Sequence, residues 1–104
     1  MDVRTFIAGV DRVELKEGFG LLAAVELRLK DGTTALIPTQ FGGYSVESFY
    51  MAAEFARLAG LPAFYDSINK GGRTLEQSYP SSEALRSQVM ANLESHVAEH
   101  FANR

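Results

Sequence analysis

The sequence contains no cysteine among its 104 residues. Disulfide bonds, cysteine metal sites and thiol chemistry are therefore excluded, and the composition fits the reducing cytoplasm, where we expect the protein to act. No apolar run approaches the roughly 18 residues that a membrane-spanning helix needs. The first fifteen residues are charged too early and too often for a secretory signal. We therefore expect no membrane partner.

An excess of basic charge is also lacking. The chain has 10 basic and 13 acidic residues, which give a net charge of −3, and neither half of it is basic. Because proteins bind duplex nucleic acid largely by neutralising phosphates with Lys and Arg, direct nucleic-acid binding is not expected. The composition is otherwise that of a folded protein, with 46% hydrophobic and 22% charged residues. The length predicts a single domain over residues 1–104.

The first forty residues have the patterning of β-strands. Apolar and charged residues alternate over residues 13–16, and apolar residues occupy the odd positions over residues 19–29. A period of two is typical of strands with one buried face. Residues 3–7 either extend the first strand through a bulge near Gly9 or form a separate edge strand.

Two short loops share the same turn chemistry, with glycine near the position that favours a left-handed backbone. The loop at residues 29–33 predicts a three-residue hairpin, whereas a competing two-residue loop would place charged residues opposite apolar ones. The loop at residues 15–19 predicts the same turn one hairpin earlier. The expected pairs are Val25 with Ile37 and Leu27 with Ala35 in the later hairpin, and Leu15 with Phe19 and Val13 with Leu21 in the earlier one.

The second half has the signals of helices. Ser45 is a favourable N-cap, and Gly60 is placed to end a helix over residues 46–59. Tyr44 and Phe49 have the spacing of a hydrophobic staple. The apolar positions are Val46, Phe49, Ala52, Ala53, Ala56 and Ala59 on one face of this helix, and Met51, Phe55 and Leu58 on its flank.

That flank must be covered, either by the last helix or by a second subunit. Glu54 and Arg57 are spaced to form an ion pair, which we expect on a solvated face.

Residues 61–68 predict one or two short helical turns, and residues 69–80 predict a loop. Residues 80–83 should cap the last helix, and Gln88 lies on its polar side. Its apolar stripe consists of Leu85, Val89, Met90, Leu93, Val97 and Phe101.

These elements predict an α+β fold, in which an antiparallel meander of three to four strands is packed on one face by two main helices. No motif ties the chain to a known family, and this fold class by itself implies no function.

The segment His96-Val97-Ala98-Glu99-His100 fits H-x-x-E-H, the zinc signature of inverzincin peptidases. Those enzymes need a further ligand downstream and a much larger domain. Both histidines also lie along the apolar stripe of the last helix. We therefore expect His96 and His100 to be packing residues, with no metal site.

Other catalytic or cofactor signatures are missing. The chain has no Walker motif, no G-x-G-x-x-G and no G-x-S-x-G. Lys70 and Arg73 flank two glycines, and such a segment can touch an anion or a partner, although a helix stop followed by a solvated loop explains the same residues. We expect no cofactor, and the sequence favours a non-enzymatic role over an enzymatic one.

Aromatic residues are plentiful in or near the predicted loops and helix ends, and Leu22, Ala24 and Leu36 lie on the second face of the predicted sheet. Tyrosine is enriched at interfaces because it combines an apolar body with a polar tip. The aromatic residues either fold back under the small domain or form an interface. They are Phe41, Tyr44, Tyr50, Phe64, Tyr65 and Tyr79.

Two functional hypotheses follow. The first is a small binding or regulatory protein of the inhibitor, immunity or anti-defence type, which contacts a larger protein or a second copy of itself. The second is a small-molecule-binding domain or minor enzyme, with a site between the turn at residues 41–44 and the loop at residues 64–79. The candidate contact residues are Phe41, Tyr44, Tyr50, Tyr65, Lys70 and Arg73.

Overall fold

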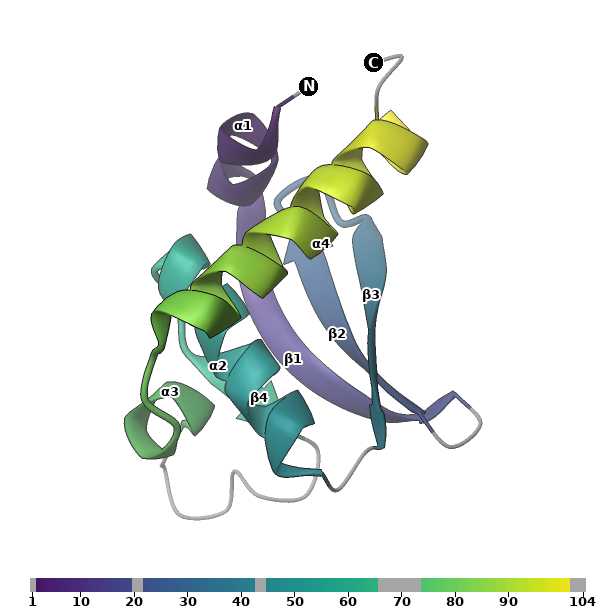
Figure 1. Cartoon of the computed structure of the whole chain (residues 1–104). Coiled ribbons are helices and arrows are strands. Elements are labelled where there is room, and N and C mark those ends of the chain that lie inside the picture. The colour runs from purple at the N-terminus through teal and green to yellow at the C-terminus, as the bar shows by residue number, and fades with distance from the viewer. Residues whose placement is uncertain (1, 20–21, 43–44, 66–73, 102–104) are drawn as a thin grey trace.

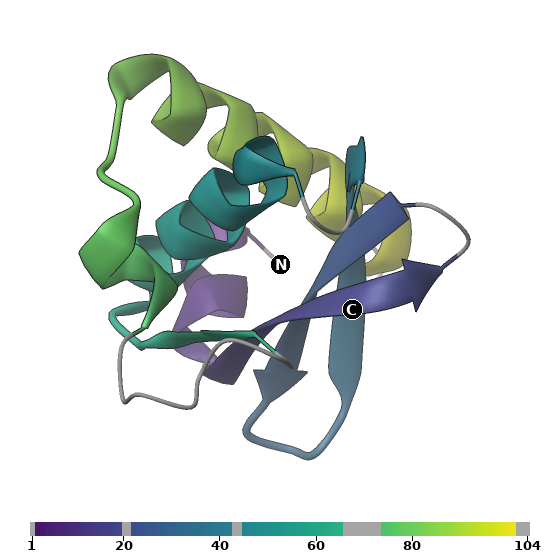
Figure 2. The same ribbon diagram turned by 90° about the horizontal axis from the view of Figure 1, so that it is seen from below.

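The computed structural model describes residues 2–19, 22–42, 45–65 and 74–101, and it confirms the α+β fold. A four-stranded sheet has the order β3-β2-β1-β4, and helices α2 and α4 pack on one face of it (Figures 1 and 2). The elements are α1 (Val3–Ala8), β1 (Val10–Phe19), β2 (Leu22–Leu29), β3 (Thr34–Gly42), α2 (Val46–Ala59), β4 (Ala63–Tyr65), α3 (Leu75–Ser78) and α4 (Glu83–Phe101).

The hairpin of β2 and β3 has the register that the three-residue loop predicts. Val25 pairs with Ile37, and Leu27 pairs with Ala35. All four side chains are buried. The loop places Gly32 at a φ of 91°, where a residue without Cβ is favoured. The predicted pairing is therefore confirmed.

The turn predicted around Gly18 is wrong, because β1 continues as a strand through this position. Val13 pairs with Leu27, and Leu15 pairs with Val25. This continuous strand brings the apolar side chains of β1 and β2 to the same face, where all four are fully buried. This burial outweighs the local turn chemistry, so the strand does not turn back at Gly18.

Residues 3–7 lie in helix α1 and not in a strand, so this expectation is also corrected. The Asp2 carboxylate caps the helix by accepting a hydrogen bond of 2.8 Å from the Thr5 N–H. The Phe6 side chain is 2% exposed, and its ring centroid lies 6.1 Å from that of His96 on α4. Packing against α4 thus overrides the strand preference of the β-branched residues in this segment.

The segment after α2 also differs from the prediction. Within residues 61–68, which were expected to be helical, β4 pairs in parallel with β1. Ala63 is fully buried, and its N–H donates to the Glu76 carboxylate at 2.9 Å. Within the loop predicted over residues 69–80, α3 forms a short helix. The partner of β4 is a strand far away in the sequence, so no local pattern marks this element.

Helix α2 has the predicted bounds. The Ser45 hydroxyl accepts a hydrogen bond from the Ser48 N–H at 3.3 Å, and Gly60 ends the helix in the left-handed conformation with a φ of 67°. Val46 is 53% exposed, so its predicted place on the buried face is wrong. Tyr44 of the predicted staple lies outside the described residues.

Helix α4 packs across α2 and covers its apolar flank (Figure 1). Met51 and Phe55 of this flank are buried, so it needs no second subunit to cover it. The predicted stripe on α4 is confirmed by the burial of Val89, Leu93 and Val97. No helix in the described part of the chain is long and apolar enough to cross a membrane.

The other face of the sheet carries charged side chains and two exposed leucines. Leu22 is 46% exposed and Leu36 is 39% exposed. Ala24 was expected to be exposed with them but is buried, because Lys16 and Pro38 pair with it from the two neighbouring strands. The exposed leucines therefore stand apart and do not form a continuous apolar strip.

Candidate functional site: an aromatic groove between α2 and α4

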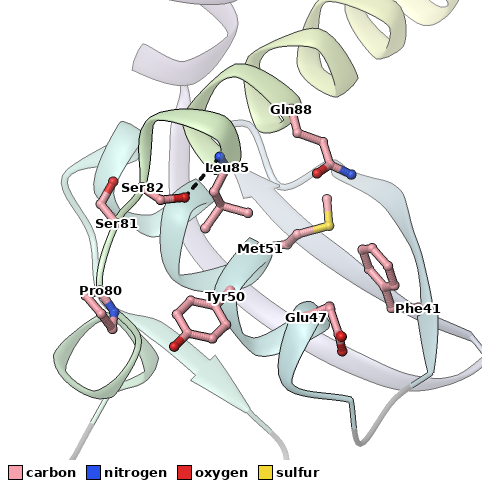
Figure 3. Close-up of a pocket in the computed structure, with 9 residues that line it drawn as sticks. All are labelled: Phe41, Glu47, Tyr50, Met51, Pro80, Ser81, Ser82, Leu85 and Gln88. Atoms are coloured by element: carbon pink, nitrogen blue, oxygen red, sulfur yellow. Dashed lines mark hydrogen bonds between the residues drawn. The ribbon is translucent and has the colours of Figure 1, made fainter.

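A groove of about 460 Å³ lies between α2, the end of β3 and the start of α4 (Figure 3). It brings together apolar side chains from three parts of the sequence and surrounds them with short polar residues. The lining residues are Phe41, Glu47, Tyr50, Met51, Pro80, Ser81, Ser82, Leu85 and Gln88.

A bulge in β3 places Phe41 at one end of the groove. Gln40 has a φ of 67° and is the one non-glycine residue with a positive φ in the described part of the chain. The buried Thr39 hydroxyl donates to the Ala23 carbonyl at 2.9 Å and accepts from the Phe41 N–H at 3.2 Å. The pairing of β2 with β3 shifts at this point. Bulges re-aim the side chains that follow them, which explains how Phe41 reaches the groove.

Tyr50 on α2 forms the other aromatic side of the groove. Its ring lies edge-on to that of Tyr79, with 5.1 Å between the ring centroids and an interplanar angle of 77°. Tyr79 also contacts Phe49, at a centroid distance of 5.4 Å. Aromatic pairs prefer such edge-to-face and tilted arrangements. The cluster therefore holds Tyr50 beside Pro80 at the rim (Figure 3).

A buried ion pair fixes the wall that precedes α4. The Glu54 carboxylate is 2% exposed and accepts hydrogen bonds of 2.9 Å from both Arg57 and the Ser81 hydroxyl. Arg57 also donates to the backbone carbonyls of Glu76 and Tyr79. The predicted pair of Glu54 and Arg57 is confirmed, but its predicted place on a solvated face is wrong. The pair instead ties α2 to the segment of residues 76–81.

The start of α4 completes the groove. The Ser82 hydroxyl accepts a hydrogen bond of 3.2 Å from the Leu85 N–H, which confirms the predicted cap. Leu85 and Gln88 are three residues apart and therefore lie on the same side of the helix, facing the groove (Figure 3). The neighbouring Ser81 hydroxyl accepts a hydrogen bond of 2.8 Å from the Arg86 guanidinium. Both serine hydroxyls thus have structural partners.

Glu47 is the single charged residue of the lining. It is exposed in the first turn of α2, where the helix dipole favours a carboxylate. No arginine or lysine side chain in the described part of the chain pairs with it. Among the described residues, the groove therefore presents one carboxylate that has no basic side chain as a partner, beside an apolar surface.

The lining residues include no histidine, lysine or arginine. Both serine hydroxyls have structural partners, and Glu47 is the one lining residue that carries a charge.

The structure brings together two of the predicted contact residues, Phe41 and Tyr50. Tyr65 lies in β4, where its backbone pairs with Leu15, but its side chain is outside the described part of the chain. The other three predicted contact residues, Tyr44, Lys70 and Arg73, also lie outside it.

Sequence reasoning missed the contribution of α4 to the groove. Gln88 was assigned to the polar side of the helix, and Pro80 and Ser81 were considered only as part of a cap. The one available signal was the spacing of Leu85 and Gln88, which places both on one face. The segment that turns this face towards α2 is positioned by Arg57, a long-range contact that no local pattern indicates.

Among the described residues, no group of three or more His, Asp or Glu side chains is placed to hold a metal ion. The ring of His96 lies against Phe6, in agreement with its predicted packing role. The side chain of His100 lies outside the described part.

Comparison of the chain with protein-family models, with curated proteins and with solved structures finds no match. A function must therefore be inferred from the groove itself.

Proposed function

We propose that this protein is a non-enzymatic binding or regulatory protein of the inhibitor, immunity or anti-defence type, and that it acts in the cytoplasm through contact with a larger protein. The observation that carries this proposal is the groove, where Phe41, Tyr50, Met51 and Leu85 meet beside a polar rim. Interfaces are enriched in aromatic residues and methionine, and a central apolar anchor surrounded by polar contacts is typical of them.

The exposure of the rim favours a macromolecular partner. Glu47, Ser81, Ser82 and Gln88 are all exposed, so the groove is open to solvent along its edges. Pockets for small molecules commonly bury about 70–90% of the ligand surface. An open groove covers less of a small ligand, whereas a protein segment can lie along it and cover the rim from above.

The volume of the groove supports a second candidate, a small-molecule-binding domain. About 460 Å³ falls within the range of roughly 300–1,000 Å³ that is typical of ligand pockets. The position also overlaps part of the predicted ligand site, because Phe41 lines the groove and Tyr79 contacts its Tyr50 wall. We rank this candidate second because of the open rim.

Affinity capture with matched bait proteins tests the first candidate. The purified chain is immobilised and exposed to lysate of its native host, beside a variant with Tyr50→Ala and Leu85→Ala and a control variant with Leu36→Ala. Leu36 is exposed on the far face of the sheet, outside the groove. We expect a stoichiometric partner that the wild type and the control retain and the groove variant loses, and the same result once this partner is purified and mixed with each bait.

Circular dichroism must show that all three baits are folded. Equal retention of the partner by the groove variant would contradict the proposal, as would the absence of a partner together with a monomer in light scattering. A metabolite that raises the melting temperature of the wild type, but not of the groove variant, would instead support the second candidate.

A further inference from the structure

We infer that the groove receives a segment of the partner protein in which a bulky apolar side chain lies next to a lysine or arginine. The apolar side chain contacts Phe41, Tyr50 and Leu85, and the cation meets Glu47. This inference rests on the proposed function and adds the chemistry of the partner to it.

The charge of Glu47 is the first reason. Glu47 is exposed at the edge of the groove and is the one charged residue of its lining. It has no basic side chain as a partner among the described residues, although it borders the apolar surface. Complementary charge across an interface raises the association rate and selects against partners with the wrong charge.

The aromatic neighbour of Glu47 strengthens the preference for a cation. Tyr50 follows Glu47 by three residues on α2, so the two side chains lie on the same side of the helix (Figure 3). An ammonium or guanidinium group is attracted both by a carboxylate and by the face of a tyrosine ring. An anionic partner group at this place would meet neither attraction.

The apolar walls of the groove account for the apolar part of the segment. Phe41, Tyr50 and Leu85 are half-buried around the groove, and the buried Met51 side chain closes its floor between Phe41 and Leu85 (Figure 3). Two aromatic rings and a leucine offer packing surface to an aliphatic or an aromatic side chain. Leucine, isoleucine, methionine or phenylalanine of the partner would therefore be accepted at this position.

The wall formed by residues 80–82 is organised before binding. Ser81 is held by Glu54 and Arg86, and Ser82 caps α4. Binding to a surface that is already ordered avoids the entropy cost of ordering it on contact. A short linear segment can therefore bind with measurable affinity, even without the rest of the partner.

A second copy of this chain does not fit the groove equally well. In a two-fold symmetric contact centred on the groove, two concave surfaces would face each other, and the two Glu47 carboxylates would approach one another. Like charges at close range oppose association. Pairing through the free edge of β3 is hindered by Pro38, which has no N–H to donate. The occupant is therefore a different protein.

A library of random peptides displayed on phage tests this inference. The bait is the complete chain, and the comparison baits are Glu47→Gln, Tyr50→Ala and the control Glu94→Gln. Glu94 is also an exposed carboxylate, but it lies on α4 outside the groove. We expect the wild type and the control to enrich peptides with lysine or arginine beside a bulky apolar residue, and Tyr50→Ala not to enrich them.

Affinities of synthetic versions of the enriched peptides, measured by fluorescence anisotropy, give the expected magnitudes. Glu47→Gln should weaken binding about two- to fivefold, as expected for a solvent-exposed ion pair. Tyr50→Ala should weaken it about tenfold or more, as expected for an interface anchor. The difference between wild type and Glu47→Gln should shrink as salt is added. Glu94→Gln should leave the affinity unchanged.

Four results would overturn the inference. Three of them are enrichment of acidic or uncharged peptides, an affinity that does not respond to Glu47→Gln, and a dimer in light scattering that Tyr50→Ala dissociates. Failure to enrich any peptide would also overturn it, because a linear segment would then not suffice. The proposed function fails separately, when a partner captured from lysate binds the Tyr50→Ala, Leu85→Ala bait as well as it binds the wild type.

Discussion

Glu54 and Ser81 lie 27 residues apart in the sequence, and a hydrogen bond of 2.9 Å joins the Glu54 carboxylate to the Ser81 hydroxyl. Glu54 is buried within the packed core, whereas Ser81 lines the groove at the surface. The same carboxylate pairs with Arg57. The stability of the fold and the shape of the groove therefore depend on one buried polar network.

Arg57→Ala should lower the free energy of unfolding by about 3 kcal/mol, because it leaves the buried Glu54 charge without its cation. Guanidinium-induced unfolding, followed by circular dichroism, measures this loss. Arg57→Lys should fall between the wild type and Arg57→Ala, since lysine keeps the charge but cannot donate in the planar arrangement of a guanidinium. A loss below about 1 kcal/mol for Arg57→Ala would mean that the pair behaves as an exposed one.

Thr39→Val should destabilise the protein by roughly 1–3 kcal/mol. Valine has nearly the same shape as threonine but removes the hydroxyl that bonds to the Ala23 carbonyl and the Phe41 N–H, and both groups then lose a partner. Thr39→Ser is the matched control, because it keeps the hydroxyl and loses about 0.8 kcal/mol of methyl burial. A larger loss for serine than for valine in chemical denaturation would contradict the role of the hydroxyl.

Gln40 and Gly60 both have a φ of 67°, and they predict opposite responses to substitution. Gln40→Gly should raise the free energy of unfolding by roughly 0.5 kcal/mol, because relief of left-handed strain exceeds the greater entropy of glycine in the unfolded chain. Gly60→Ala should lower it by about 1 kcal/mol, because alanine brings strain to the end of α2. Thermal and chemical unfolding of both variants, compared with the wild type, give the two signs. A loss of stability in Gln40→Gly would contradict the assigned strain.

The pKa of the Asp2 carboxyl should lie below its ordinary value of 3.8, because the Thr5 N–H donates to the charged form. A group whose pKa is lower in the folded protein stabilises the fold above its unfolded pKa, and this contribution disappears as the pH falls through the folded pKa. The start of α1 should therefore loosen in acid. An NMR titration of the Asp2 carboxyl and the Thr5 amide measures both effects. Asp2→Asn keeps a capping side chain but should abolish the dependence on pH.

The parts of the fold that the sequence predicted are those with local causes. Ser45 and Gly60 define both ends of α2 through hydrogen bonds and backbone conformations within a few residues. The loop at residues 29–33 fixes the register of β2 with β3, because a shift of one residue would expose every apolar side chain of the hairpin. Such signals can be recognised without knowledge of the remaining chain.

The parts that the sequence did not predict depend on distant contacts. Residues 3–7 have the composition of a strand, but α1 forms because Phe6 packs on α4. β4 exists because Ala63 pairs with Val13 of β1. Glu54 and Arg57 have the spacing of a surface ion pair. Glu54 is nevertheless buried, because residues 76–81 pack against the pair through hydrogen bonds to both side chains. In each case the tertiary environment outweighs the local preference.

The candidate site was predicted only in part for the same reason. Phe41 and Tyr50 were candidate contact residues because they are aromatic and lie near predicted loops and helix ends. The residues that complete the groove, Leu85 and Gln88, lie on a helix that reaches α2 only through packing. Sequence spacing could place these two on one face but could not show which element that face meets.

Helix α4 carries the groove at its beginning and the contact with α1 towards its end, so the two features are separated along the helix (Figure 1). Residues 85 and 97 are about 18 Å apart along a helix that rises about 1.5 Å per residue. A dye, an affinity handle or a solid support attached at α1 would therefore stand away from the groove. Immobilised in this way, the protein leaves the groove accessible.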